Sequence, residues 1–157
     1  MRSTRFLGLL GLAVFAAMVS SGARAEGTLT NNGTYSDGSV KVDLDDYTDG
    51  PSVVALMGMK SGSTSISFAW DSTDWPDVLK LWNDARAMTG SSYATAGSLR
   101  EVGSSAQAVI TFAGGPAVRV TIVDPTAGAL IYTVQPGDED AFGSALEITG
   151  NAATKVN

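Results

Sequence analysis

The hydrophobic pattern of this chain switches from a strand period to a helix period, and this switch limits the folds available to it. Apolar residues alternate with polar ones over residues 39–45 and 64–70, and residues 52–59 are almost continuously apolar. Alternation is typical of a strand with one buried face, and a short apolar run is typical of a buried strand. We therefore expect three strands before Asp71, with a turn over residues 46–51.

The period then lengthens to that of an amphipathic helix. Asp74 offers a capping oxygen, and Pro76 falls in the first turn, where its missing N–H is tolerated. Trp75 and Trp82 are seven positions apart, so they share one face. The spacing predicts a helix over residues 74–88 with both tryptophans in the core.

The second half of the chain repeats this plan more weakly. Strands are expected over residues 98–103, 106–113, 117–123 and 129–134, followed by a second helix capped by Asp138. Residues 26–39 are rich in Thr, Asn, Gly and Ser and are expected to form short edge strands or a partly ordered lead-in.

A shift of 64 positions aligns the hydrophobic patterns of the two halves better than it aligns their residue identities. The aligned pairs are Val54–Val118, Ile66–Leu130, Phe68–Tyr132, Asp74–Asp138, Val78–Phe142 and Trp82–Leu146. Strand runs that are each closed by one helix indicate an α+β fold, with antiparallel sheets and two helices packed on them. We interpret the halves as two pseudo-repeats, about residues 26–90 and 91–157.

This order of elements is similar to the arrangement in the whirly and PUR-type folds that bind single-stranded nucleic acid. The similarity lies in element order alone, since no residue motif of those families accompanies it. Similarity of fold does not carry function.

The first 25 residues have the features of a secretory signal peptide. Arg2 and Arg5 precede an apolar run over residues 6–19, and Ala23 and Ala25 supply the small residues that a signal peptidase reads. The run is short for a permanent membrane helix. We therefore expect residues 1–25 to be removed and residues 26–157 to form a single domain. Its expected location is the bacterial periplasm or the medium, without membrane insertion after cleavage.

Composition limits the chemistry that the chain can perform. There is no histidine and no cysteine, which excludes imidazole-based triads, disulfides and the usual ligands of transition metals. Three of the ten basic residues lie in the expected leader, so the remainder has seven basic and sixteen acidic residues, a net charge of −9. Such a charge disfavours nucleic acid and favours a basic protein partner.

Four carboxylates, Asp43, Asp45, Asp46 and Asp49, form the densest acidic stretch. If they lay on a flexible turn, their oxygens would suit calcium, although the spacing does not fit an EF-hand. Paired with a second acidic cluster over residues 138–140, they would instead suit a carboxylate-based glycan hydrolase. A calcium or small-ligand site and a hydrolase are thus two alternatives.

Three aromatic residues are candidates for a binding surface. Trp70 ends a predicted strand, Tyr47 lies beside the acidic stretch, and Tyr93 lies in a loop expected over residues 91–98. No GxSxG, SxxK or phosphate-loop motif is present. The leading hypothesis is therefore an exported, non-enzymatic binding module without a cofactor, for example an inhibitor or immunity-type protein.

Overall fold

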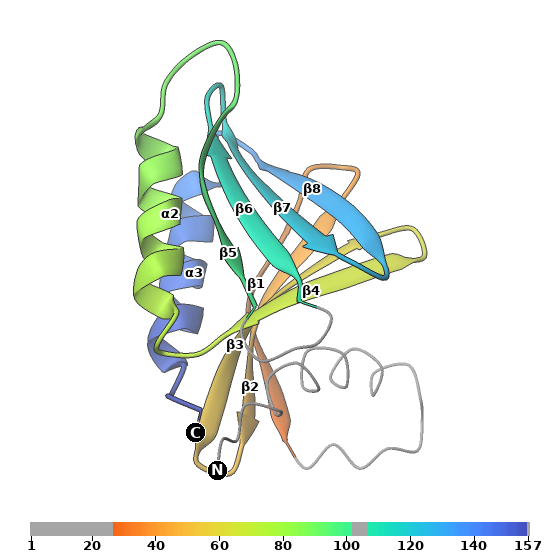
Figure 1. The fold of residues 1–157 in the computed structure, drawn as a ribbon, viewed down its shortest axis with the longest axis vertical. Helices are drawn as coiled ribbons and strands as arrows, with labels where there is room; N and C mark the ends of the chain where they lie inside the picture. Colours follow the sequence, from red (N-terminus) through yellow and green to blue (C-terminus); the bar gives the residue numbers. More distant parts are fainter. Residues whose placement is uncertain (1–26, 102–106, 157) are drawn as a thin grey trace.

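The computed structural model describes residues 27–101 and 107–156 (Figure 1). The expected signal peptide lies outside the described residues. In chain order the elements are β1 (Thr28–Ser36), β2 (Lys41–Asp49), β3 (Ser52–Ser61), β4 (Thr64–Trp70), α2 (Trp75–Ala87), β5 (Ala94–Arg100), β6 (Val109–Gly114), β7 (Val118–Asp124), β8 (Gly128–Val134) and α3 (Glu139–Ala152).

The strands form two four-stranded antiparallel sheets in which chain neighbours pair. Sheet 1 has the order β1-β2-β3-β4, and sheet 2 has the order β5-β6-β7-β8. One helix follows each sheet in the chain. The predicted α+β class, with antiparallel sheets and two helices packed on them, is confirmed, and the paired sheets fit the two pseudo-repeats.

Each helix packs against the sheet of the other half. Helix α2 follows sheet 1 but packs against β5, β6 and β7, and α3 follows sheet 2 but packs against β1, β2 and β3. Both helices lie on the same side of the molecule and contact each other (Figure 1). Neither half covers its own sheet, so the two halves interlock around a shared core.

The inner faces of the two sheets and the apolar faces of the helices form this core. Two equivalent cross-strand rows lie at its centre: Leu44, Met57 and Phe68 in sheet 1, and Phe112, Val120 and Tyr132 in sheet 2. All six side chains are buried. Phe142 of α3 stacks on Tyr132 at 5.8 Å and lies 5.1 Å from the ring of Trp82 in α2.

The 64-residue relation holds for the edge strands and the helices but not for the inner strands. Strands β4 and β8 begin 64 positions apart, as do the two helices. In the inner strands Leu44 corresponds to Phe112, and Met57 corresponds to Val120. The expected pair of Val54 with Val118 is therefore wrong, because Val54 faces away from the main core and Val118 faces into it.

Two local predictions also need correction. Residues 46–51 were expected to form a turn, but β2 continues to Asp49 because it pairs with β1 on one side and β3 on the other. Strand β5 begins at Ala94, inside the expected loop. Of the two alternatives for residues 26–39, the structure has the edge strand, which is β1 and is nine residues long.

Candidate functional site

The four aspartates of the predicted acidic turn lie along strand β2. Asp43, Asp45 and Asp49 alternate onto the outer face of sheet 1, whereas Asp46 points to the inner face under α3. Side chains two residues apart on a strand are separated by about 7 Å. Within residues 27–101 and 107–156, no group of three or more His, Cys, Asp or Glu side chains could hold a metal ion. The aspartates thus lie along a strand and not on the expected turn.

Three of the four carboxylates on this strand, Asp43, Asp45 and Asp46, accept a hydrogen bond from a side chain of strand β1. Asn31 Nδ2 donates to Asp45 Oδ1 at 2.7 Å, and Asn32 Nδ2 donates to Asp46 Oδ2 at 2.7 Å. Burial raises the pKa of Asp45 and Asp46, and the amide donors partly oppose the shift. Asp45 and Asp46 are neighbours on the strand, so their side chains point to opposite faces of sheet 1.

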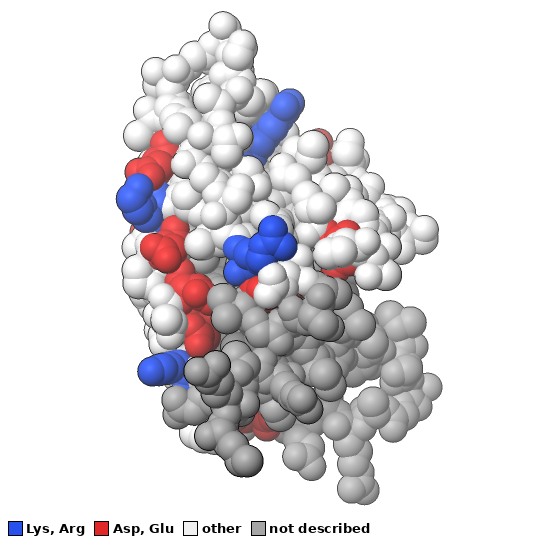
Figure 2. All heavy atoms as spheres, viewed as in Figure 1, with Lys and Arg blue, Asp and Glu red and all other residues white. Residues whose placement is uncertain are grey.

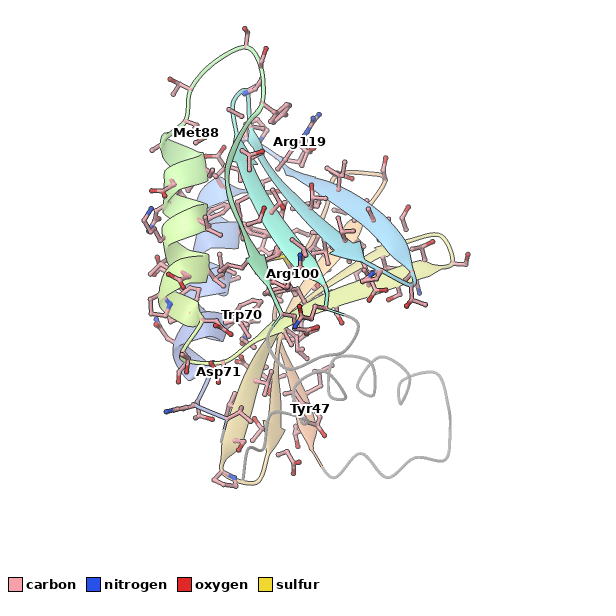
Figure 3. All side chains as sticks on the ribbon, in the orientation of Figure 1. Tyr47, Trp70, Asp71, Met88, Arg100 and Arg119 are labelled. Atoms are coloured by element: carbon pink, nitrogen blue, oxygen red, sulfur yellow. The ribbon has the colours of Figure 1, made fainter. Side chains whose placement is uncertain are left out.

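The candidate aromatic residues do not share a surface. Trp70 has no exposed area, so its expected position at the surface is wrong; Ile66, Phe68 and Trp70 all face the core. Trp75 and Trp82 are buried, as predicted. Tyr47 is half-buried on the outer face of sheet 1, below the level of Trp70 in Figure 3. Tyr93 lies at the other end of the molecule, before sheet 2.

Tyr93 supports an arginine on the outer face of sheet 2. The guanidinium carbon of Arg119 lies 3.6 Å from the centre of the Tyr93 ring. Arg119 Nε also donates to Thr133 Oγ1 at 3.3 Å. A cation stacked on an aromatic ring keeps its orientation at low conformational cost. Arg119 is therefore held in place while remaining half-exposed.

Three cross-strand rows of residues make up the outer face of sheet 2. The rows are Arg100, Val109, Val123 and Ala129; Ser98, Thr111, Thr121 and Ile131; and Thr95, Ala113, Arg119 and Thr133. Val123 is 42% exposed and Ile131 is 53% exposed. They are two of the three large exposed hydrophobic residues in the described part of the chain, and they lie on adjacent strands.

The charge on this face differs from that of the helices. Its rows contain two arginines and no carboxylate. Acidic side chains gather instead along the side where α2 lies, and the surface over β6 and β7 is mainly neutral (Figure 2). Arg100 and Arg119 mark the sheet side in Figure 3. The outer face of sheet 2 thus combines aliphatic and hydroxyl side chains with two arginines, of which Arg119 is held by Tyr93, in an acidic protein.

Sequence reasoning did not identify this surface, although the pattern contained a signal for it. In β7 and β8 the inward residues are apolar, so the outward ones are expected to be polar. Val123 and Ile131 break that alternation, because both are aliphatic residues at outward positions. An aliphatic residue on the solvent side of two successive strands indicates a surface with a use beyond packing.

Comparison of the chain with protein-family models, curated proteins and solved structures finds no match to any of them. Among the residues that the structure describes, no helix has the length and apolar character needed to cross a membrane.

Proposed function

We propose that this chain is an exported, non-enzymatic binding module whose protein partner docks on the outer face of sheet 2. The observation that carries the proposal is the exposure of Val123 and Ile131 on adjacent strands, in rows that also hold Arg100 and Arg119. Exposed aliphatic side chains bordered by polar groups are characteristic of protein interfaces. An inhibitor or immunity-type role is one form of this function.

The chemistry of the face favours a protein over a nucleic acid as the partner. Binding of single-stranded nucleic acid uses aromatic platforms in a positively charged groove. The three rows contain no aromatic side chain, and Tyr93 beside them is covered by Arg119. Arginine and aliphatic residues together suit a partner surface that combines apolar side chains with carboxylates.

The expected basic partner would meet a different part of the molecule. The helices carry acidic residues that include Asp77, Asp84 and Asp140, where Lys80 and Arg86 neutralise some of them. A partner drawn by net charge would approach this helical side. The two docking modes therefore predict different sensitive residues.

Two matched substitutions separate these modes. Ile131→Asp places a charge in the middle of the outer face of sheet 2, and Ile148→Asp places one at a similarly exposed position on α3, where Ile148 is 57% exposed. Crosslinking in periplasmic extract should capture a partner with the wild type and with Ile148→Asp, and lose it with Ile131→Asp. Loss with Ile148→Asp alone would assign binding to the helices and overturn the proposal.

A further inference from the structure

Two acidic residues in equivalent positions of the two halves each reach across to the opposite sheet. Asp37 follows β1 and Glu101 follows β5, and the two are 64 positions apart. The N–H of Thr133 in β8 donates to Asp37 Oδ2 at 3.0 Å. The N–H of Ala69 in β4 donates to Glu101 Oε1 at 3.1 Å. Thr133 and Ala69 are themselves 64 positions apart, so the two contacts are related by the internal repeat.

Both contacts satisfy backbone groups that the sheets leave unpaired. Strands β4 and β8 are the last strands of their sheets, so their outward N–H groups have no ladder partner. A carboxyl oxygen from the other half takes that place in each case. The backbone N–H of each acid also donates within its own half, from Asp37 to Val40 O at 3.2 Å and from Glu101 to Ala108 O at 2.9 Å. The two halves are therefore fastened to each other reciprocally.

The two contacts differ in how well their surroundings stabilise an ionised carboxylate. Asp37 accepts backbone bonds from Ser39 and Val40 as well as from Thr133, and these donors lower the pKa of its carboxyl although partial burial opposes them. Glu101 is only 7% exposed. Burial raises the pKa of Glu101 to about 7, against the opposing effect of its backbone donors.

The charged surroundings of Glu101 do not favour its ionised form. The neighbouring β4 and β6 contain no charged residue. Asp124 at the end of β7 raises the pKa of Glu101 further. Asp45 lies two strands from Ala69 in the same cross-strand row, and Arg100 precedes Glu101 on its own strand and faces the outer side of sheet 2. No ion pair to Glu101 is present in the described part of the structure to hold its charge in place.

We propose that the contact between Glu101 and the edge of β4 is a pH-operated latch between the two sheets, whereas the contact between Asp37 and β8 stays closed between pH 4.5 and 7.5. A protonated Glu101 remains buried and accepts the Ala69 N–H through its carbonyl oxygen. Once the carboxyl ionises, water solvates it better than the buried site does. The open form, in which Glu101 has left Ala69 and is exposed to water, is then stabilised relative to the closed form, in which the contact is made. This inference does not depend on the proposed partner surface.

Linkage fixes the direction and the range of the effect. The closed form has the raised pKa, about 7, and an open, solvated Glu101 has the ordinary one, 4.5. Opening therefore becomes about tenfold more favourable per pH unit between these values and levels off above them. The latch is tightest at acidic pH and weakest at neutral pH.

Amide hydrogen exchange at Ala69 and Thr133, measured by NMR from pH 4.5 to 7.5, tests the proposal. After correction for intrinsic exchange rates, protection at Ala69 should fall by about one to two orders of magnitude, and protection at Thr133 should not follow it. Glu101→Gln should abolish the pH dependence at Ala69, and Asp37→Asn should leave it in place. Protection at Ala69 that is constant with pH, or that falls equally in Glu101→Gln, would overturn the latch.

A second measurement needs no variant. In the wild type the side-chain carboxyl carbon of Glu101 should titrate with a midpoint near 7, and the Ala69 amide signal should shift with the same midpoint. If the carboxyl instead titrates near its ordinary value, or if the Ala69 amide does not respond, the proposal is wrong.

Discussion

Two glycines allow each helix to pack closely against the sheet of the opposite half. Gly33 and Gly97 lie at β-bulges in β1 and β5, and the two bulges are 64 positions apart. A Cβ at Gly33 would lie 2.9 Å from Ala145 Cβ in α3, and a Cβ at Gly97 would lie 2.5 Å from Leu81 Cδ2 in α2. At each bulge the backbone approaches a helix too closely for a side chain, so the repeat is present in the packing as well as in the topology.

The two glycines should differ in their tolerance of alanine. At Gly97 the obstacle is the free end of a leucine side chain, which can turn away. At Gly33 the obstacles are Ala145 Cβ and the ring of Tyr35, whose hydroxyl is held by the Ala141 carbonyl at 2.9 Å. Gly33→Ala should cost about 1–3 kcal/mol of unfolding free energy, and Gly97→Ala less than about 1 kcal/mol. Urea unfolding of both variants measures the difference; equal costs would contradict this account.

At the scale of elements, local pattern was sufficient for β4 and α2 but not for the partners of the helices. The alternation over residues 64–70 and the proline in the first turn of the helix lead directly to these two elements. Asp74 stands at the N-cap of α2 as predicted, but its side chain makes no capping hydrogen bond. The exchange of helices depends on contacts between residues distant in sequence, and no local period records them. Asp residues have low strand propensity, so the continuation of β2 to Asp49 follows from its two neighbouring strands rather than from its composition.

The candidate surface was missed for a related reason. Sequence reasoning looked for chemistry in clusters of acids and aromatics, and the structure separates both kinds of cluster. Arg100 and Arg119 are 19 positions apart and reach one face only through the pairing of β5, β6 and β7. To predict which residues share a face, the strand register must be known, because a shift of one residue moves every side chain of the strand to the opposite face.

A buried hydroxyl joins α3 to sheet 1. Thr149 Oγ1 accepts from Asn32 Nδ2 at 3.0 Å and donates to the Ala145 carbonyl at 2.9 Å. Thr149→Val keeps the volume but removes both bonds, so it should lower the unfolding free energy by about 1–2 kcal/mol. Thr121→Val, on the outer face of sheet 2, is the matched control and should change stability little. Calorimetry that finds no difference between the two variants would argue against this role for Thr149.

The whole molecule behaves as one unit because each half supplies the cover for the other. A helix that leaves its place exposes the sheet of the opposite half, and the contacts of Asp37 and Glu101 fasten both edges. Glu101 is buried at one of these joints, and Asp37 is half-buried at the other. The dependence of stability on pH should therefore reflect the joints more than the exposed carboxylates.

Stability should be greatest at mildly acidic pH and decline toward neutrality. Burial raises the folded-state pKa of four carboxyls, those of Asp45, Asp46, Asp74 and Glu101. The contribution of each of these groups to the unfolding free energy is complete below its unfolded-state pKa and is lost as the pH rises through its folded-state pKa. Asp37, whose pKa is lowered, contributes in the opposite sense and loses its stabilisation as pH falls below about 4.

The largest single contribution to this decline belongs to Glu101. The rise of its pKa from 4.5 to about 7 corresponds to at most about 3 kcal/mol, lost between those two pH values. Urea unfolding at pH 4.5, 5.5, 6.5 and 7.5 should therefore give a falling free energy in the wild type and a flatter profile in Glu101→Gln, while Asp37→Asn should lower the free energy by about the same amount at all four pH values. A wild-type profile that rises with pH across this interval would mean that the carboxyls at the joints are ionised without cost, and that these buried contacts do not govern how the two halves hold together.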